Sequence, residues 1–295
     1  MTEEFCDVGR GITLCYEAFG DAEDPPVLLI MGLATQMIAW HEEFCRQLAA
    51  RGYYVVRFDN RDAGRSTHVP GRPPTTAELL LRSKKPARYT LGDMAEDAHG
   101  LLRSLDLAPA HVVGASMGGM IAQTLAARHF EDVRSLVSIM SNTGSRWSGQ
   151  PSPRIYPTFL RRAPLERADF IAHLERLFLT IGSPGYERDI EDVRALAGLS
   201  FDRAHDPHSA GRQLAAIIAS GDRTKELHHI TAPTLVVHGT ADPLVAPSGG
   251  RATARAIRGA KLKMIDGMAH DLPRALWPTM IDAIAEHAAA ADGAR

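Results

Sequence analysis

The stretch HVVGASMGGMIAQ, at residues 111–123, constrains the fold of this chain more than any other. Its apolar beginning predicts a buried strand, and its later apolar residues recur at the spacing of a helix. Because the apolar run breaks into mostly small residues before the helical spacing begins, we expect the chain to turn sharply from strand to helix. Such a turn is typical either of a dinucleotide-binding loop or of a G-x-S-x-G nucleophile elbow, which exposes a serine.

The dinucleotide interpretation fails on three points. The G-x-x-x-G-x-G loop of short-chain dehydrogenases needs a glycine where this chain has Met120. That loop follows the first strand of its sheet, whereas this turn lies beyond residue 110. None of the six tyrosines is followed four residues later by the lysine of the dehydrogenase pair. We therefore expect a nucleophile elbow with Ser116 at its tip and the small residues Gly114 and Gly118 on either side.

A serine hydroxyl is a weak nucleophile unless a histidine, held by an acid, removes its proton. In elbow proteins the acid and then the histidine follow the serine, on loops after late strands. Asp242 follows the apolar run 234–238, and His270 follows the run 261–265. We expect these two residues to complete a catalytic triad with Ser116.

Other residues compete for these roles. His238 is the nearest rival base, but it lies within a predicted strand and is expected to serve structure. Asp266 and Asp271 flank the histidine and are rivals for the acid, although Asp242 is favoured because it follows a strand of its own.

An oxyanion hole requires two backbone donors. In elbow proteins one is the N–H of the residue after the nucleophile, here Met117. The other comes from the loop after an early strand, predicted at 27–31, where Gly32 permits a turn. We expect the N–H of Leu33 to be this second donor.

Strand-like and helix-like segments alternate along most of the chain. The predicted strands are 12–19, 27–31, 54–58, 111–115, 135–140, 234–238 and 261–265. Predicted helices include one from Met37 to Leu48 and one opened by Thr90, with Asp93 placed for a capping box. This alternation predicts a parallel sheet with helices on both faces. It lapses from 142 to 228, where prolines and short amphipathic pieces indicate a helical insertion.

Two segments are candidates for contact with a substrate. The basic stretch 67–88 is expected to be a solvated loop with one helical turn, with substrate contact as the alternative. The insertion contains twelve basic and eleven acidic residues, so it predicts no strong charge preference. Five of its aromatic residues are candidates for a pocket lining or for the insertion's own core; they are Trp147, Phe159, Phe170, Phe178 and Phe201.

The chain resembles the α/β-hydrolase fold family over nearly its whole length. The matching motifs are LLIMGLAT, RFDNRDAGRST, HVVGASMGG, VVHGTADPL and IDGMAH. The resemblance implies an α/β fold with a mostly parallel eight-stranded sheet, a core of residues 1–141 and 229–295, and a helical cap at 142–228. Most members have His-Gly where this chain has Met31-Gly32. That feature and the turn at 59–66 are similar to the aclacinomycin methylesterases, which hydrolyse a methyl ester on a polyketide.

The expected activity is hydrolysis of a carboxylic ester through an acyl-enzyme. Carbon–carbon bond hydrolases, lactonases and perhydrolases use the same triad and remain alternatives. A ligand-binding protein without catalysis is the alternative from another class. A serine at the elbow argues against relatives that use an aspartate nucleophile.

Composition excludes several other classes. A net charge of −2 leaves no general electrostatic footprint for nucleic acid. No apolar run reaches the roughly 20 residues that span a bilayer, and the polar, acidic N-terminus does not resemble a secretory signal. Three unpaired cysteines indicate a reducing cytoplasm. The pairs His205/His208 and His228/His229 could be ligand pairs, but the sequence has no H-E-x-x-H motif and no carboxylate at ligand spacing, so we expect no metal and no cofactor. The expected partner is a small-molecule ester, and the chain is expected to be a monomer or a homodimer.

Overall fold

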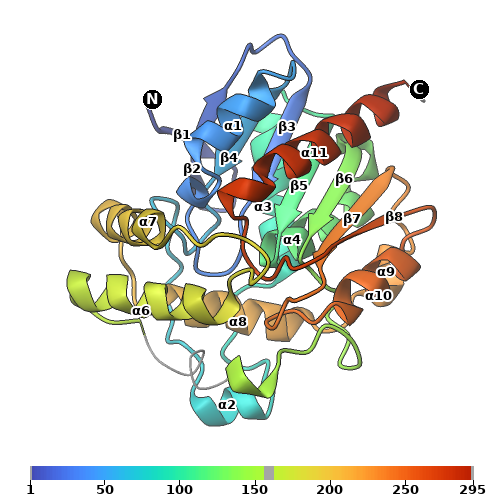
Figure 1. The fold of residues 1–295 in the computed structure, drawn as a ribbon. Helices are drawn as coiled ribbons and strands as arrows, with labels where there is room; N and C mark the ends of the chain where they lie inside the picture. Colours follow the sequence, from blue (N-terminus) through green and yellow to red (C-terminus); the bar gives the residue numbers. More distant parts are fainter. Residues whose placement is uncertain (1, 156–162, 294–295) are drawn as a thin grey trace.

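The computed structural model describes residues 2–155 and 163–293. Its centre is one eight-stranded sheet in the order β1-β2-β4-β3-β5-β6-β7-β8 (Figure 1). The strands are β1 Glu4–Asp7, β2 Thr13–Phe19, β3 Pro26–Ile30, β4 Tyr54–Phe58, β5 Ala110–Ala115, β6 Val133–Ile139, β7 Thr234–Gly239 and β8 Lys261–Ile265. Pairing is antiparallel from β1 through β2 to β4 and parallel from β4 to β8. The expected α/β fold is confirmed.

The strand β1 was not predicted. It has only four residues, EFCD, of which only Cys6 is buried. So short a segment, half charged, carries too little hydrophobic pattern to be recognised, and pairing with β2 decides its conformation.

Helices cover both faces of the sheet. One face carries α1 Glu42–Ala49 and α11 Trp277–Asp292, and the other carries α3 Leu91–Ser104, α4 Met117–Arg128, α9 Thr224–Leu227 and α10 Ser248–Ala256. Figure 1 shows α1 and α11 lying together across one side of the strands.

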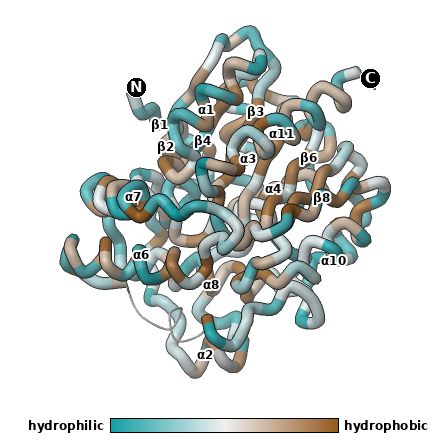
Figure 2. The backbone as a smooth tube through the Cα atoms, viewed as in Figure 1, coloured by the Kyte–Doolittle hydropathy of each residue, from teal (hydrophilic) through white to brown (hydrophobic). Residues whose placement is uncertain are grey.

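The two faces bury separate hydrophobic cores because strand side chains alternate between them. In β3, Leu28 and Ile30 pack with α3 and α4, whereas Val27 and Leu29 pack with α1 and α11. The apolar stretches accordingly gather in the strands and in α4 (Figure 2). Strands buried on both sides explain the continuous apolar runs in the sequence.

Local signals placed some helix boundaries well and others poorly. The Thr90–Asp93 capping box is present, and α3 begins at Leu91. The helix expected over 37–48 is instead a short 3-10 turn, η1 Met37–Ala39, followed by α1. The continuous helix was wrong because the backbone leaves the helical region at Trp40, with ψ 89°, and at His41, with ψ 143°. Asp59 accepts the Met37 N–H at 2.7 Å and so fixes the start of η1 through a tertiary contact.

Three further helices follow β6 in the chain: α6 Arg167–Ile181, α7 Ile190–Arg203 and α8 Ser209–Ser220 (Figure 1). The first two pack against each other, and α8 packs against α3. The helix α2 Thr76–Leu80 lies near them. The cap boundaries of 142–228 stay a prediction. Helix α9 lies near the end of that range, but it packs against α4 and α10, which cover one face of the sheet. Of the helices within the described residues, none combines the length and hydrophobicity needed to cross a bilayer.

Candidate active site

The turn between β5 and α4 holds Ser116 in a strained backbone conformation, with φ 55° and ψ −119°. Tight packing around the turn excludes larger neighbours. A Cβ on Gly114 would lie 2.2 Å from the Gly118 carbonyl oxygen, and one on Gly118 would lie 2.1 Å from the Ile30 oxygen. Since real Cβ atoms do not approach so closely, both positions require glycine. The elbow therefore packs closely against the carboxyl end of β3.

Sheet register brings the predicted oxyanion loop beside the serine. β3 and β5 are parallel neighbours, with Ile30 paired to Gly114. The loop after β3 consequently lies against the elbow, and a Cβ on Gly32 would be 3.1 Å from the Ser116 Cβ. Within the described part of the chain, no acceptor is found for the N–H of Leu33 or of Met117. An oxyanion hole requires donors of this kind, without an acceptor in the protein.

The three predicted catalytic side chains form one hydrogen-bonded chain. The Ser116 Oγ lies 2.9 Å from His270 Nε2, and His270 Nδ1 lies 2.7 Å from Asp242 Oδ2. The other oxygen of Asp242 accepts the N–H groups of Leu244 and Val245, both at 2.9 Å. This arrangement orients the imidazole so that its Nε2 can accept the serine proton.

The three rival residues make hydrogen bonds of their own, although His238 Nε2 lies only 3.6 Å from Asp242 Oδ2. His238 is fully buried and donates from Nε2 to the Val245 carbonyl at 2.8 Å, and burial lowers its pKa. Asp266 is exposed and accepts from the Thr240 hydroxyl. Asp271 bonds to Ser183. Among the residues described, only His270 hydrogen-bonds to the Ser116 hydroxyl.

Ser183, which follows α6, was not singled out from the sequence. Its hydroxyl accepts the Ala269 N–H at 2.8 Å and donates to Asp271, so it holds the two residues on either side of His270. The Ile181 carbonyl also accepts the His270 N–H at 2.9 Å. The histidine loop is therefore fixed by a segment that precedes it by nearly ninety residues, and sequence pattern contains no signal for such a contact.

A cavity of about 1580 Å³ opens above the serine and is lined by Ser116, His270, Leu33 and Met117. Helices α6, α7 and α8 and the segment around α2 each contribute six or seven of its other lining residues. This volume exceeds the roughly 300–1,000 Å³ of ordinary small-molecule sites. The cavity has room for a substrate with several rings.

The aromatic residues singled out from the sequence have different surroundings, and only some of them line the cavity. Phe170 and Phe178 line the cavity. Phe201 stacks on the His205 ring with centroids 4.4 Å apart. Trp147 is 94% exposed, so its expected place in a pocket or core is wrong, and Phe159 lies outside the described residues.

The basic stretch 67–88 takes part in the cavity wall. Pro73, Thr76, Leu79 and Arg82 line it, from α2 and its flanks. The expected single helical turn is confirmed as α2. The alternative of substrate contact is therefore better supported than a purely solvated loop.

Two clusters of histidine and carboxylate groups occur within the described ranges. In the cluster that contains Asp62 and Asp206, Arg212 already pairs with both carboxylates, so its guanidinium supplies the positive charge that a metal ion would supply. In the second, the rings of His99 and His129 stack with centroids 3.8 Å apart. Nearly parallel stacked rings cannot aim their in-plane lone pairs at one ion. The expectation that no metal or cofactor is needed stays a prediction.

Known hydrolases are similar to this chain in sequence and in structure. The family model for the alpha/beta hydrolase fold matches residues 25–273. Rhodomycin D methylesterase DauP of Streptomyces sp. (strain C5) is 30% identical over 95% of this chain and 96% of its own length. Rhodomycin D methylesterase DnrP of Streptomyces peucetius is 29% identical with the same coverage. A hydrolase structure from Pseudomonas aeruginosa PA01 has a TM-score of 0.72 and 25% identity, with 97% of both chains covered. The resemblance to methylesterases inferred from the motifs is confirmed.

Proposed function

The chain belongs to the alpha/beta hydrolase fold family, and we propose that it hydrolyses the methyl ester of a bulky, ring-containing acid. The observation that carries this proposal is the hydrogen-bonded chain Ser116–His270–Asp242 at the base of the large cavity. Two relatives named as methylesterases that align with nearly the whole chain support an ester as the substrate.

The first half of the reaction forms an acyl-enzyme. The Ser116 Oγ attacks the ester carbonyl carbon while His270 Nε2 takes its proton. The carbonyl oxygen becomes an oxyanion that the N–H groups of Leu33 and Met117 stabilise. When the tetrahedral intermediate collapses, the carbon–oxygen bond to the alcohol breaks. His270 gives its proton to the departing methoxide, which leaves as methanol.

The second half hydrolyses this intermediate. A water molecule attacks the acyl carbon while His270 again takes a proton. The same two backbone donors stabilise the second oxyanion, and collapse returns the proton to Ser116. The free acid leaves. Throughout the cycle, Asp242 accepts the Nδ1–H of His270 and stabilises the imidazolium.

The cavity supports a bulky acyl group as the specificity determinant. A methyl leaving group needs little space, so most of the volume remains for the acid portion. The lining is rich in apolar residues of α6, such as Phe170, Leu174 and Leu177, which favours rings over ions. Near-balanced charge in the predicted cap agrees with selection by shape.

A panel of esters tests both the reaction and the substrate class. The panel contains the methyl ester of a polycyclic aromatic acid and the p-nitrophenyl esters of acetate, butyrate, octanoate and palmitate. We expect kcat/KM to be highest for the polycyclic methyl ester and lowest for the palmitate ester. A fluorophosphonate should label Ser116, and Ser116→Ala should lower kcat by about 10⁴- to 10⁶-fold.

Each outcome has a distinct meaning. Highest activity on palmitate would contradict the substrate class while leaving the hydrolase intact. Failure to turn over any ester, together with failure of Ser116 to react with the probe, would contradict the enzyme itself and favour a binding protein. Undiminished activity of Ser116→Ala would contradict the assigned nucleophile.

A further inference from the structure

Side chains from other parts of the chain hold the loop that carries the Leu33 N–H. Immediately before it, the Asn60 side chain donates to the Met31 carbonyl at 2.9 Å. Immediately after the proposed donor, Ala34 adopts a positive φ of 57°, which costs energy for a residue with a side chain. Such a conformation persists only where neighbouring groups fix it. At Ala34 the fixing group is a side chain from a distant helix.

Gln213 of α8 supplies that group. Its Oε1 accepts the Ala34 N–H at 2.8 Å, and its Nε2 donates to the Arg61 carbonyl at 2.9 Å. These partners determine the orientation of the amide, since a backbone N–H needs the oxygen and a carbonyl needs the nitrogen. The side chain is fully buried. It therefore bridges the oxyanion loop and the turn after β4 through two satisfied hydrogen bonds.

Gln213 does not line the described cavity, although its neighbours Gly211 and Leu214 do. A substrate in the cavity would touch the loop but not this amide. Any effect of Gln213 on the reaction must therefore pass through the two segments that it holds, the oxyanion loop and the turn after β4. Backbone N–H groups stabilise an oxyanion when they lie about 2.7–3.1 Å from it, so small displacements matter.

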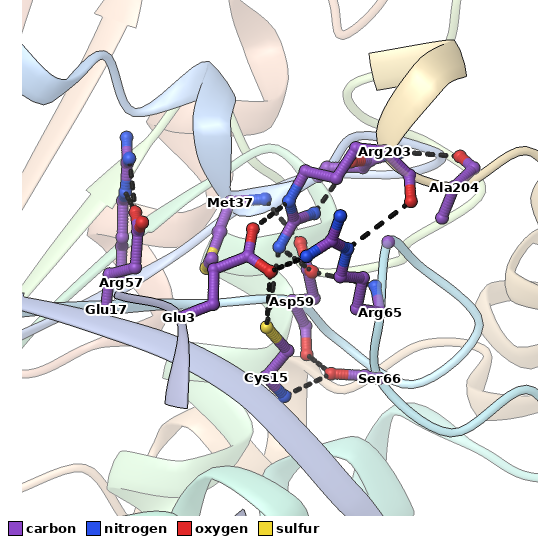
Figure 3. A network of polar contacts seen from close by, with 12 residues as sticks. Glu3, Cys15, Glu17, Met37, Arg57, Asp59, Arg65, Ser66, Arg203 and Ala204 are labelled. Carbon is purple, nitrogen blue, oxygen red and sulfur yellow. Dashed lines mark hydrogen bonds and ion pairs between the residues drawn. The ribbon is translucent and has the colours of Figure 1, made fainter. Parts of the chain in front are cut away.

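A second group of contacts fixes the far end of the same loop (Figure 3). Asp59 accepts the Met37 N–H at 2.7 Å and pairs with Arg203, which ends α7, at 2.7 Å. Arg203 also donates to the Gln36 Oε1 at 2.7 Å. These contacts anchor residues 36 and 37 and leave the Ala34 amide to Gln213 alone among the described side chains.

We propose that Gln213 is a positioning residue that sets the oxyanion donor Leu33 by holding the Ala34 amide. The proposal rests on the ester-hydrolase function given above. It assigns to α8 a part in transition-state stabilisation, in addition to forming the cavity wall. Loss of the Gln213 amide releases Ala34 from its strained conformation and moves the Leu33 N–H away from the developing oxyanion.

The test compares three variants of the full chain. Gln213→Met removes both hydrogen bonds at similar volume, whereas Gln213→Glu keeps an acceptor for the Ala34 N–H. Gln123→Met is the matched control, because Gln123 is equally buried and hydrogen-bonds to Ser138 and Arg223 without touching the oxyanion loop. For p-nitrophenyl butyrate, we expect Gln213→Met to lower kcat on the order of 10- to 100-fold with KM nearly unchanged. Gln213→Glu should recover part of this loss.

Inhibitor binding separates positioning from general damage. Affinity for a boronic acid that forms a tetrahedral adduct on Ser116 should fall in parallel with kcat in Gln213→Met. Affinity for the free carboxylic acid product should not change. Equal losses of kcat in Gln213→Met and Gln123→Met would overturn the proposal. An increase in KM for Gln213→Met without a decrease in kcat would also overturn it.

Amide hydrogen exchange gives a readout that does not need turnover. The peptide containing residues 32–36 should exchange faster in Gln213→Met than in the wild type or in Gln123→Met. Unchanged exchange there would overturn the proposal even if the wild type hydrolysed no ester. An inactive wild type with the expected exchange would instead contradict the proposed function alone.

Discussion

At the scale of single residues, Asp242 has the most demanding position in the proposed site. Its fully buried side chain accepts hydrogen bonds from His270 and from the N–H groups of Leu244 and Val245. Such a carboxylate selects the imidazole tautomer with hydrogen on Nδ1. An amide in its place can present a donor to Nδ1 and so favour the wrong tautomer.

We therefore expect Asp242→Asn to lower kcat by about 10⁴-fold with substrate affinity retained. Steady-state kinetics on p-nitrophenyl butyrate measure this. Asp266→Asn is the matched control, since Asp266 is exposed and its side chain accepts a hydrogen bond from Thr240. A comparable loss in the control, with Asp242→Asn still active, would show that the acid has been assigned to the wrong loop.

At the scale of elements, α11 contains a buried histidine that ties the helix to the sheet. His287 donates from Nε2 to the Pro233 carbonyl at 3.1 Å, just before β7. Burial lowers its pKa below the ordinary value of 6.5, and Lys261 lowers it further. As pH falls through about 6.5, the unfolded chain binds a proton that the folded chain does not. The contribution of His287 to stability is thus present above that pH and is lost below it.

We expect His287→Gln to make the unfolding free energy less dependent on pH between 7 and 5, since glutamine can donate to the same carbonyl without titrating. The difference in slope should not exceed about 1.4 kcal/mol per pH unit, the value for one proton. Urea unfolding at several pH values measures it. An unchanged slope would mean that His287 binds its proton equally in both states.

At the scale of the whole molecule, Arg203 joins α7 to the body of the fold. It pairs with Asp59 at 2.7 Å and Glu3 at 2.5 Å, and its side chain is 4% exposed (Figure 3). Burial raises the pKa of Asp59, while Arg203 opposes that rise. Removing the guanidinium would leave a buried carboxylate without its partner.

Arg203→Met should consequently lower the unfolding free energy by about 3–5 kcal/mol, as is usual when one partner of a buried pair is removed. The matched control is Arg167→Met, because Arg167 forms a solvent-exposed pair with Asp202. The control should change stability little. Thermal and chemical unfolding provide the measurement, and equal effects of the two substitutions would show that α7 is held by other contacts.

The proposed catalytic residues could be predicted from sequence because their signals are local. The G-x-S-x-G turn, the small residues beside Ser116 and the strands before Asp242 and His270 can each be recognised within about ten residues. Parallel strands place their carboxyl ends at one edge, so three loops far apart in the chain could be expected to meet. The structure brings these side chains within hydrogen-bond distance. Hydrophobic pattern likewise predicted the parallel strands, of which all but the edge strand β8 are largely buried on both faces.

The supporting contacts could be found only in the tertiary structure. Gln213 and Arg203 lie in helices whose sequences look like ordinary amphipathic segments, and their partners are 179 and 167 residues away. A buried polar side chain is specified by the group it must satisfy, and that group is absent from its own stretch of sequence. Cavity volume depends in the same way on how α6, α7 and α8 pack together. Periodicity indicates that a helix buries one face, but only packing against the rest of the chain decides which atoms that face contacts.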